Sequence, residues 1–405
     1  MAKAKIIAAI DVGSSKIATL IAQHREDEEK LHIIGVAASP SKGVRKGQVV
    51  NIEETVEAIV TSVESAERMA GFNVSKAWVL LDGAHIGSQN SKGVVAVSQP
   101  HGEINADDVR RVMEAAKAVS LPTSCEIVHV VPRSFTVDGQ TGIKDPIGMT
   151  GVRLEVDTHI VTGSSTTIKN LAKCVSEVGC DVAGLVFGGL ASGESCLTDT
   201  ERELGVVLVD IGGGTTSLAI YVEGALSYSA VLPVGAKNVT NDLAIGLRVS
   251  LESSEKIKLF LTNHKNKDKE DDLDLTSLNL PEDLKTVSYK TVVEGIIRPR
   301  LNELFTAVSN EIRKSGLAAM TPAGLVLCGG GAMTVGIVEA AKRNLSMPVR
   351  VGVPMGITGL VDDIENPSFT ASVGLLKYGL KQSSEESSMK LNLDNLPGKG
   401  IFNKF

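Results

Sequence analysis

The sequence lacks the cysteine patterns that identify disulfide-rich or zinc-binding proteins. Its five cysteines lie at positions 125, 174, 180, 196 and 328, and no two of them form a C-x-x-C pair. An odd number of scattered cysteines argues against a disulfide framework or a zinc site. We therefore expect reduced thiols, mostly buried, in a cytoplasmic protein.

Long hydrophobic runs are also missing. The apolar stretch from Ile6 to Ile10 is short, ends at Asp11 and has no cleavage site of the kind that follows a secretory signal. Nowhere do about 18 apolar residues follow one another, so we expect no membrane-spanning helix.

The chain has no excess of positive charge. Its 48 Asp and Glu residues outnumber 41 Lys and Arg residues, which gives a net charge of −7. A protein that binds nucleic acid would be strongly basic, so no nucleic-acid partner is expected. The 405 residues, 43% of them hydrophobic, are enough for two or more domains with cores of their own.

Two stretches about 200 residues apart repeat nearly the same pattern. They are IIAAIDVGSSKIATLIA at residues 6–22 and VVLVDIGGGTTSLAIYV at residues 206–222. Each predicts an apolar strand, an Asp, a tip of small residues and a second apolar strand, which is a β-hairpin. A glycine-rich tip lets backbone N–H groups approach an anion, so two facing tips would hold a polyphosphate from both sides. The alternative for either copy alone is an ordinary glycine turn in which Asp favours the bend.

The side chains at the two tips suggest how a metal ion and phosphates would be held. Asp11 and Asp210 precede the tips, where they would organise Mg²⁺ through water, because Mg²⁺ keeps several of its waters. Lys16 would place a positive charge on phosphate. Hydroxyl donors would come from Ser14, Ser15, Thr215 and Thr216.

A third glycine-rich turn follows a buried strand in LVLCGGGAM at residues 325–333, and a helix is predicted after it. Glycines before a helix favour contact with a nucleotide. The dinucleotide fingerprint fits poorly because its third glycine and its later acidic residue are missing, and no GxxxxGK[ST] motif of a P-loop occurs. The predicted helix SSEKIKLF carries Glu255 and Lys258 on one face, either to bracket an adenine and ribose or as part of a solvated face.

The remaining pattern alternates strands and helices. Apolar spacing predicts helices at 52–70, 103–119 (capped by Asn105), 164–179 (capped by Ser165 or Thr166), 236–247, 252–261 and 288–315, the last interrupted near Pro299. Strands are predicted at 30–39, 76–85, 93–98, 126–132, 133–138 and 152–162, with loops at 139–150 and 263–278.

In this order, the two hairpins, the E-x-x-K helix and the GGG turn resemble the actin and sugar-kinase superfamily over residues 6 to about 380. Within it the sequence is most similar to the FtsA family of bacterial division proteins, which link FtsZ filaments to the membrane. The similar stretches are IAAIDVGSSKI, ELGVVLVDIGGGTTSLAIY, VLPVGAKNVTNDLAIGL, SSEKIKL, IIRPRLNEL and LVLCGGGAM. The resemblance implies an α/β, actin-like duplicated ATPase fold, with two halves around a nucleotide cleft and an inserted α+β subdomain of the SHS2 type.

The resemblance also implies domain boundaries. The first half comprises 1–83 and 164–200, and a helix at 366–380 packs back on it. The inserted subdomain occupies 84–163, and the second half 201–365, within which 236–315 form a smaller subdomain. Residues 381–405 would be a flexible linker and the remnant of a membrane-targeting tail.

ATP would then lie between the halves. The residues implied to bind it are Asp11, Gly13, Ser14, Ser15 and Lys16 of the first hairpin, Asp210, Gly212, Gly213, Gly214, Thr215 and Thr216 of the second, Gly235, Asn238, Glu255 and Lys258, and Gly329, Gly330, Gly331, Ala332 and Met333.

The resemblance also bears on catalysis. Relatives that hydrolyse ATP usually carry Glu or Gln at the start of the helix before the second phosphate loop, where it orients or deprotonates water. Gly188 and Gly189 stand there, and Glu194 comes two helical turns too late. We therefore expect no catalytic residue of this kind, slow hydrolysis, and ATP acting as a structural switch.

Three functions compete at this stage. The first is an ATP-dependent adaptor that polymerises and recruits division proteins. The second is a sugar kinase or chaperone ATPase, against which stand the absence of a convincing base-like Asp and of a substrate domain after residue 380. The third is a rod-shape filament protein like MreB, against which stands the insertion.

Partners also follow from the resemblance. The FtsZ C-terminal tail would dock near IIRPRLNEL, where Arg298 and Arg300 either pair with an acidic peptide or are merely solvated. Further partners would be a second copy of the chain and later division proteins such as FtsN, through the insertion. The family's C-terminal amphipathic helix would anchor it to the inner membrane face, but GIFNKF offers only Phe402 and Phe405 with Lys399 and Lys404. Either that helix is truncated, or anchoring depends on avidity along a filament.

Overall fold

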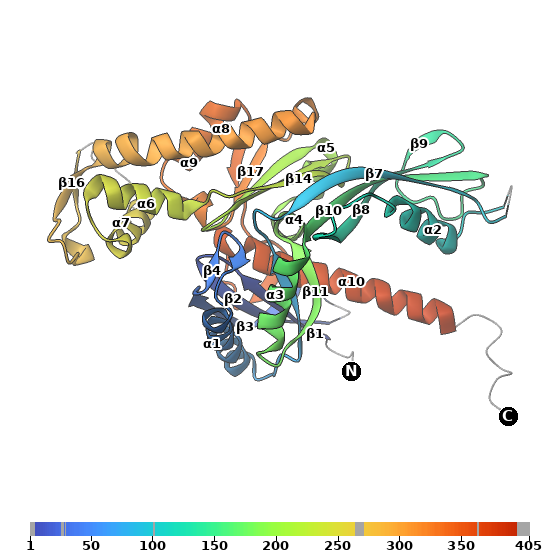
Figure 1. Cartoon of the computed structure of the whole chain (residues 1–405), viewed down its shortest axis with the longest axis horizontal. Coiled ribbons are helices and arrows are strands. Elements are labelled where there is room, and N and C mark those ends of the chain that lie inside the picture. Colours follow the sequence, from blue (N-terminus) through green and yellow to red (C-terminus); the bar gives the residue numbers. More distant parts are fainter. Residues whose placement is uncertain are drawn as a thin grey trace.

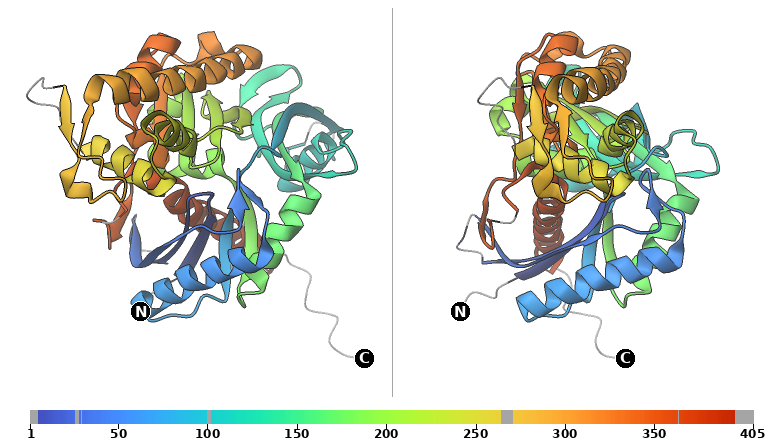
Figure 2. Two further views of the ribbon diagram at one scale, coloured as in Figure 1. Left: turned by 60° about the vertical axis from the view of Figure 1, so that its left-hand side comes forward. Right: turned by 90° about the vertical axis from the view of Figure 1, so that its left-hand side faces the viewer.

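The computed structural model describes residues 5–25, 28, 30–99, 102–263, 271–362 and 364–394. Two lobes, each built on its own sheet, lie one above the other in Figure 1, and a smaller sheet extends to one side of them. The two rotated views in Figure 2 show the same separation of the lobes, with the long helix α10 (Thr370–Asp394) between and behind them.

The first half is built on a six-stranded sheet with the order β11-β6-β1-β2-β3-β19. The hairpin β1–β2 comes first, and β6 then pairs in parallel with β1. Helix α1 begins after Asn51, whose side chain accepts a hydrogen bond from Glu54 N, and ends at Gly71, which has a φ of 70°. The elements are β1 (Lys5–Val12), β2 (Lys16–His24), β3 (Leu31–Pro40), β4 (Val44–Arg45), β5 (Gln48–Val49), α1 (Ile52–Ala70), β6 (Lys76–Leu81), α3 (Ser165–Ser176), β11 (Asp181–Phe187), α4 (Gly188–Cys196), α5 (Asp199–Leu204) and β19 (Ile357–Gly359).

The second half repeats this plan with a five-stranded sheet of order β14-β13-β12-β17-β18. Strand β17 pairs in parallel with β12, as β6 does with β1. The predicted second hairpin and the helix from residue 236 are confirmed. The elements are β12 (Val206–Ile211), β13 (Thr216–Val222), β14 (Ala225–Leu232), α6 (Ala236–Leu247), α7 (Leu251–Asn263), β15 (Asp272–Asp274), β16 (Thr286–Ser288), η2 (Lys290–Ile297), α8 (Arg298–Ser315), β17 (Leu325–Cys328), α9 (Ile337–Leu345) and β18 (Val349–Val351), with short 3₁₀ turns at Thr276–Leu278, Ala318–Met320, Gly330–Met333 and Pro367–Phe369.

Between the two parts of the first half lies an antiparallel sheet of order β7-β10-β8-β9 with one helix against it. Its elements are β7 (Gly87–Ala96), α2 (Ala106–Ala116), β8 (Cys125–Val137), β9 (Gln140–Ile143) and β10 (Arg153–Ser164). Its own small core includes Val112, Leu154 and Val156. The predicted α+β character of this stretch is therefore confirmed.

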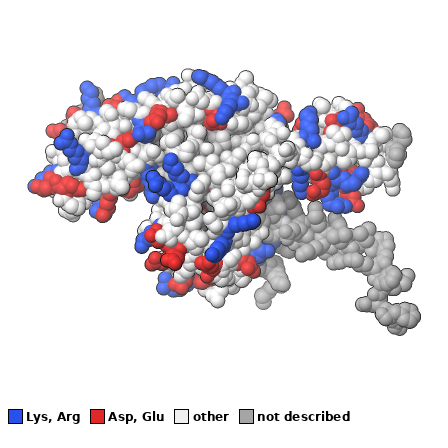
Figure 3. Space-filling model, viewed as in Figure 1, with Lys and Arg blue, Asp and Glu red and all other residues white. Residues whose placement is uncertain are grey.

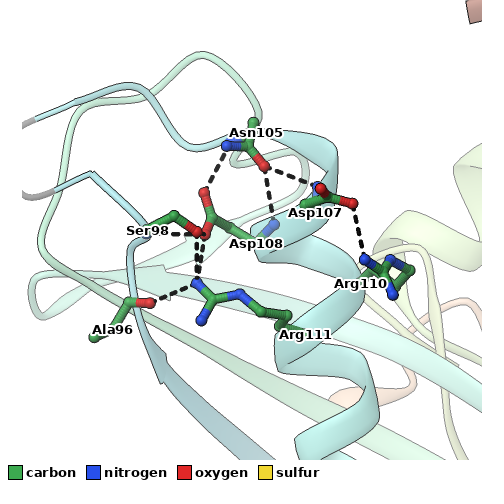
Figure 4. Close-up of polar contacts among 7 residues, drawn as sticks. All are labelled: Ala96, Ser98, Asn105, Asp107, Asp108, Arg110 and Arg111. Atoms are coloured by element: carbon green, nitrogen blue, oxygen red, sulfur yellow. Dashed lines mark hydrogen bonds and ion pairs between the residues drawn. The ribbon is translucent and has the colours of Figure 1, made fainter. Parts of the chain in front are cut away.

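Asn105 begins helix α2, as predicted, within the polar network of Figure 4. Its side chain accepts hydrogen bonds from the backbone N–H groups of Asp107 and Asp108, and the Asp108 carboxylate in turn accepts one from Asn105 N. Asp108 also accepts bonds from Ser98 and pairs with Arg111 at 2.6 Å. Burial alone would raise the pKa of Asp108, but these donors hold it at about 2. The reciprocal cap thus fixes the helix to the edge of the inserted sheet.

Helices α4 and α10 cross between the two halves in backbone contact. A Cβ atom at Gly374 of α10 would collide with the backbone oxygen of Ala191 in α4, so only glycine fits there. Ser192 and Ser372 lie close to this crossing along the two helices. Helix α10 also lies against β1, β2 and β6 of the first half.

Several local predictions are wrong. Residues 125–137 form the single strand β8, because Pro132 lies beside a register shift in the pairing with β10 and does not end the strand. The predicted loop at 139–150 contains strand β9. Ser164 is the N-cap of α3, without a side-chain bond, in place of Ser165 or Thr166. The predicted interruption near Pro299, by contrast, is present: the helix changes at residue 298 from the π-helical η2 to α8, and Pro299 lies in the first turn of α8, where its missing N–H costs little.

The C-terminal helix is longer than predicted. Helix α10 continues to Asp394, so most of the stretch expected to be a linker is helical. The physical reason is that neither glycine nor proline occurs between Gly379 and Pro397 to end the helix. The tail residues Lys399, Phe402, Lys404 and Phe405 lie outside the described residues, as do residues 264–270 of the mixed-charge loop.

On the face shown in Figure 3, basic and acidic residues are interspersed over both lobes and the insertion. This agrees with the small net negative charge of the sequence. Within the described residues, none of the helices is both long enough and apolar enough to cross a membrane.

Candidate functional site

The two repeated motifs form hairpins with the same tip geometry. In the first, Gly13 N donates a hydrogen bond to Lys16 O at 3.1 Å, and in the second, Gly212 N donates to Thr215 O at 2.9 Å. In both hairpins, therefore, a four-residue turn brings the backbone N–H groups of the tip to the end of two buried strands. The two predicted hairpins therefore share the same backbone hydrogen bond at the tip.

The two tips touch each other. A Cβ atom at Gly213 would lie 2.7 Å from Ser15 Cβ, and one at Gly214 would lie 2.8 Å from Ser14 Oγ. Only glycine therefore leaves room at the second tip for the serines of the first. Lys237 of α6 also reaches across, since its Nζ donates to Ser14 O at 2.6 Å. The halves thus meet at the point where the repeated motifs face each other.

A cavity of about 240 Å³ lies between the halves at this contact. It brings together most of the residues that the sequence suggested. Those that line it are Asp11, Gly13, Ser14, Ser15, Lys16, Asp210, Gly212, Gly213, Gly214, Thr215, Glu255, Lys258, Gly329, Gly330, Gly331 and Met333.

Each hairpin places its aspartate against a serine of a crossing helix. Asp11 Oδ2 accepts a hydrogen bond from Ser372 Oγ at 2.9 Å, and Asp210 Oδ2 accepts one from Ser192 Oγ at 2.5 Å. Burial raises the pKa of Asp210 to about 7 against the lowering effect of Ser192, and burial also raises the pKa of Asp11 against the lowering effect of Lys16. Both carboxyls would be stabilised in their charged form by a cation in the cavity.

Lys16 supplies positive charge at this site. Its Nζ atom donates to Ser368 Oγ at 3.0 Å and lies 3.2 Å from the ring centroid of Phe369. Burial lowers the pKa of Lys16 to about 8, although Asp11 and Asp210 act in the opposite direction. An anionic ligand in the cavity would raise this pKa again and stabilise the charged form.

The third glycine-rich turn packs directly behind Asp210. Gly329 has a φ of 77°, and a Cβ atom there would collide with Asp210 Oδ1. The turn continues as a short 3₁₀ segment, Gly330–Met333, and α9 begins only at Ile337. The predicted helix after the glycines is therefore confirmed as α9, and Gly336, with a φ of 76°, separates it from the 3₁₀ segment.

The Glu255–Lys258 pair also faces the cavity. Lys258 Nζ lies 2.7 Å from Glu255 Oε2 and 2.9 Å from Thr240 Oγ1. Lys258 is buried, with 7% of its surface exposed, so this is not a solvated face.

Four predicted residues support the cavity without lining it. Thr216 Oγ1 donates to Val234 O at 2.8 Å, and Asn238 Oδ1 accepts from Gly235 N at 3.1 Å. Gly235 lies against the backbone oxygens of the second tip, where a Cβ atom would be 2.6 Å from Gly213 O, and Ala332 is buried.

The two predicted partner residues are already paired within the chain. Arg300 forms a two-pronged ion pair with Asp242 of α6, at 2.5 and 2.9 Å, and also contacts Glu303. Arg298 pairs with Glu294. Neither arginine lines the cavity between the halves.

Sequence reasoning missed Asp82, Lys237 and Ser368, which line the same cavity. Asp82 directly follows β6, whereas the strand predicted from the sequence runs over 76–85 and includes it. The usable signal was its place at the end of a buried strand, because β6 runs parallel to β1 and ends beside the first hairpin. Asp82 is thus a carboxylate in the cleft that sequence reasoning did not identify.

In the described part of the chain, no group of three or more His, Cys, Asp or Glu side chains is arranged to hold a metal ion. That Asp11 and Asp210 hold a metal ion through its waters stays a prediction.

Comparison with known families matches two parts of the chain. A model described as "SHS2 domain inserted in FTSA" matches residues 83–162, and one described as "Cell division protein FtsA" matches residues 207–374. The cell division protein FtsA of Pseudomonas aeruginosa is 40% identical over 392 residues, which cover 96% of this chain and 92% of that protein. FtsA of Bacillus subtilis is 38% identical over 379 residues, covering 94% and 84%.

Solved structures resemble the fold at low sequence identity. The PilM–PilN type IV pilus biogenesis complex matches with a TM-score of 0.65 and 14% identity, covering 92% of this chain and 98% of that chain. MreB5 of Spiroplasma citri bound to ADP matches with a TM-score of 0.54 and 13% identity, covering 96% and 99%. These likenesses bear on the fold, and the predicted actin-like architecture is confirmed.

Proposed function

The chain belongs to the FtsA family of cell division proteins, and on this premise we propose that it is an ATP-binding, actin-like adaptor of the division machinery. Its role in cell division follows from the family. We further propose that it polymerises, binds the FtsZ C-terminal tail and tethers FtsZ filaments to the inner face of the cytoplasmic membrane. The observation that carries the nucleotide-dependent part is the meeting of two matched hairpins, one from each half, over one cavity.

The residues of the cavity fit ATP with Mg²⁺. Two turns of small residues present backbone N–H groups, and Lys16 supplies positive charge for phosphates, while Glu255 and Lys258 would bracket the adenine and ribose. Asp11 and Asp210, whose pKa values burial raises, would hold Mg²⁺ through its waters. The metal would neutralise charge on the phosphates.

ATP would act mainly as a structural switch. A ligand held by hairpins of different halves favours the arrangement in which both hairpins face it, by an amount set by its differential affinity. Helix α4 begins at Gly188, so no side chain projects from the position where hydrolysing relatives carry Glu or Gln. Slow hydrolysis would leave the bound form long-lived.

The FtsZ tail is proposed to dock on the 236–315 region. Arg298 and Arg300 lie there, and an acidic peptide would have to replace Glu294 or Asp242 as their partner. Beside Asp242 on α6, Ile245 is 77% exposed, which offers apolar surface to the same peptide. Charge reversal at Arg298, which is less buried than Arg300, is expected to weaken binding of an FtsZ tail peptide about tenfold in a fluorescence-anisotropy titration.

Contact with later division proteins such as FtsN is proposed at the inserted sheet. A cavity of about 820 Å³ lies between β8, α4, β14 and α10, and its lining includes Met113, His129, Arg202, Tyr221 and Tyr378. Membrane attachment is proposed through the C-terminal tail beyond Asp394, toward which α10 leads away from the body in Figure 1.

Electron microscopy of negatively stained samples tests the proposal. The purified chain is imaged with MgATP and without nucleotide, in solution and on a lipid monolayer, beside two variants. Asp210→Ala is expected to abolish nucleotide-dependent filaments, whereas Asp181→Ala, at the exposed far end of β11, is expected to leave them unchanged. Absence of polymer in every condition, together with rapid ATP turnover, would reject the adaptor in favour of an enzyme.

A further inference from the structure

The space beside Gly188, where α4 begins, is not open. A Cβ atom at Gly188 would lie 2.8 Å from Asp82 Oδ2, which follows β6 on the same half of the molecule. A carboxylate therefore occupies the volume into which a side chain at position 188 would project. The glycine makes room for this carboxylate.

The sheet of the first half places Asp82 beside the phosphate hairpins. Strand β6 pairs in parallel with β1, with Ile10 opposite Val79, so both strands end at the same edge. Asp82 leaves this edge next to the first tip and lines the cavity together with Asp11, Asp210 and Lys16. It thus lies among the groups assigned to phosphate and metal.

Two donors orient the Asp82 carboxylate. Ser217 Oγ of β13 donates to Oδ2 at 2.5 Å, and Gly83 N donates to Oδ1 at 2.9 Å. Ser217 is the residue paired with Asp210 across the second hairpin, so the bond joins Asp82 to the opposite half. Each oxygen has a further lone pair, because a carboxylate accepts about four bonds.

The acidity of Asp82 suits proton transfer near neutral pH. Burial raises its pKa to about 6, against the lowering effect of Ser217 and Gly83. Such a carboxylate is mostly ionised at pH 7 and more basic than an exposed one.

We propose that Asp82 orients the water that attacks the terminal phosphate of bound nucleoside triphosphate, in place of the side chain absent from position 188. The inference rests on the proposed nucleotide site. The water oxygen forms a bond to the γ-phosphorus, and the bond from that phosphorus to the β–γ bridging oxygen breaks. The diphosphate leaves with that electron pair, and the water's proton passes to an Asp82 oxygen and then to solvent. The slow hydrolysis of the chain depends on this group.

A merely structural role for Asp82 predicts something different. If Asp82 only joined the halves through Ser217, its loss would change stability and nucleotide affinity together. If it orients water, its loss lowers turnover while affinity is kept. Separate measurements of binding and of a single turnover distinguish the two.

The test uses the full chain with MgATP as the probe. Affinity is measured by equilibrium dialysis, and phosphate release by a single turnover of terminally labelled ATP. For Asp82→Asn we expect about a 100-fold slower turnover with affinity within about threefold of wild type. Ser217→Ala, which removes one orienting donor, is expected to slow turnover about fivefold, because the carboxylate remains. The matched control Asp181→Asn is expected to change neither.

Chemical rescue provides a readout that a structural role would not move. In Asp82→Gly, sodium formate is expected to raise the turnover rate at least about tenfold, because it returns a carboxylate to the space beside Gly188. Asp82→Ser serves as a second variant, with thermal melting as the check on folding.

Three results would overturn the inference. One is an Asp82→Asn variant that turns over ATP at the wild-type rate. Another is a parallel loss of rate and affinity without rescue by formate. The third is a wild-type chain that binds MgATP and releases no phosphate above background. A wild-type chain that does not bind MgATP at all would instead refute the nucleotide site itself, and the inference with it.

Discussion

The first phosphate hairpin carries two serines and a lysine at its tip, whereas the second carries three glycines and a threonine. Both tips close with the same backbone hydrogen bond, so the difference lies in side chains. Where the tips touch, Ser14 and Ser15 fill the space that side chains at Gly213 and Gly214 would need. The comparison teaches that two copies of one motif can have different roles: the first supplies charge and hydroxyl groups, and the second supplies backbone N–H groups without side chains.

The aspartates of the two hairpins show a second difference. Asp11 is held by Ser372 of α10, and Asp210 by Ser192 of α4, so neither hairpin fixes its own carboxylate. Asp210 is additionally backed by Gly329, whereas Asp11 faces Lys16. The two halves therefore depend on the same pair of crossing helices.

The largest effect is expected from filling the bare tip. Gly213→Val is expected to weaken MgATP binding more than about 100-fold, because the new side chain must displace Ser15 or open the tips. The reciprocal change Ser15→Gly, at the tip that tolerates side chains, is expected to cost about threefold or less. Titration with a fluorescent ATP analogue compares them, and equal losses would contradict this difference in roles.

The charge difference predicts the next effect. Lys16→Met is expected to weaken MgATP binding about 10- to 100-fold, since a charge-assisted contact with phosphate is lost. Thr215→Val, at the matching place in the second tip, is expected to cost only a few-fold. Isothermal titration calorimetry measures both, and a larger loss in Thr215→Val would reverse the assignment of charge to the first hairpin.

The two serines offer a smaller test, on stability. Ser192→Ala and Ser372→Ala are each expected to lower the free energy of unfolding by about 1–2 kcal/mol, because each removes a donor from a largely buried carboxylate. Urea denaturation of the nucleotide-free protein provides the values. If the loss of unfolding free energy in the double variant differs by more than about 0.5 kcal/mol from the sum of the two single losses, the hairpins are coupled through the helices.

The last expected effect is on the pH dependence of stability. The folded state raises the pKa of Asp210 to about 7 and of Asp82 to about 6, so between about pH 4 and 7 it binds more protons than the unfolded chain. These groups therefore make the free energy of unfolding fall as pH rises through that window. Asp210→Asn is expected to flatten this decline in denaturation series at pH 5, 6 and 7.

Comparison with wild type is needed because three histidines, His85, His129 and His159, act in the opposite direction. Burial lowers the pKa of His129 and of His159 to about 4, so their contribution to stability is lost as pH falls from about 6.5 to 4. The variant and wild type share this effect, and the difference between their curves isolates Asp210. An unchanged curve for Asp210→Asn would contradict its raised pKa.

Much of this arrangement could be predicted from local sequence. The hairpins follow from their glycine-rich tips, helix α1 from the spacing of its apolar residues, and the cap of α2 from Asn105 itself. Each of these signals acts within a few positions of sequence. The grouping of most site residues followed once the two motifs were recognised as copies of one pattern. These signals are local, or they repeat in the chain.

What could not be predicted depends on contacts between distant segments. Asp82 becomes a cavity residue only because β6 pairs with β1 and because glycine stands at position 188. The pairing of Arg300 with Asp242 joins α8 to α6 across 58 positions of sequence. The extension of α10 to Asp394 was missed for another reason, since a serine-rich composition was interpreted as a linker although no residue there breaks a helix.

The contact of Gly374 with the backbone of Ala191 has a mechanical consequence. Backbone-to-backbone contact contains no rotamers that could absorb a displacement, so α4 and α10 can pivot about this point but cannot be pressed closer together. Ser192 lies one residue from the pivot and Ser372 two residues, and each is bonded to the aspartate of a different hairpin. A rotation of one half against the other about this contact would therefore displace both hydrogen-bonded serines, and with them both carboxylates.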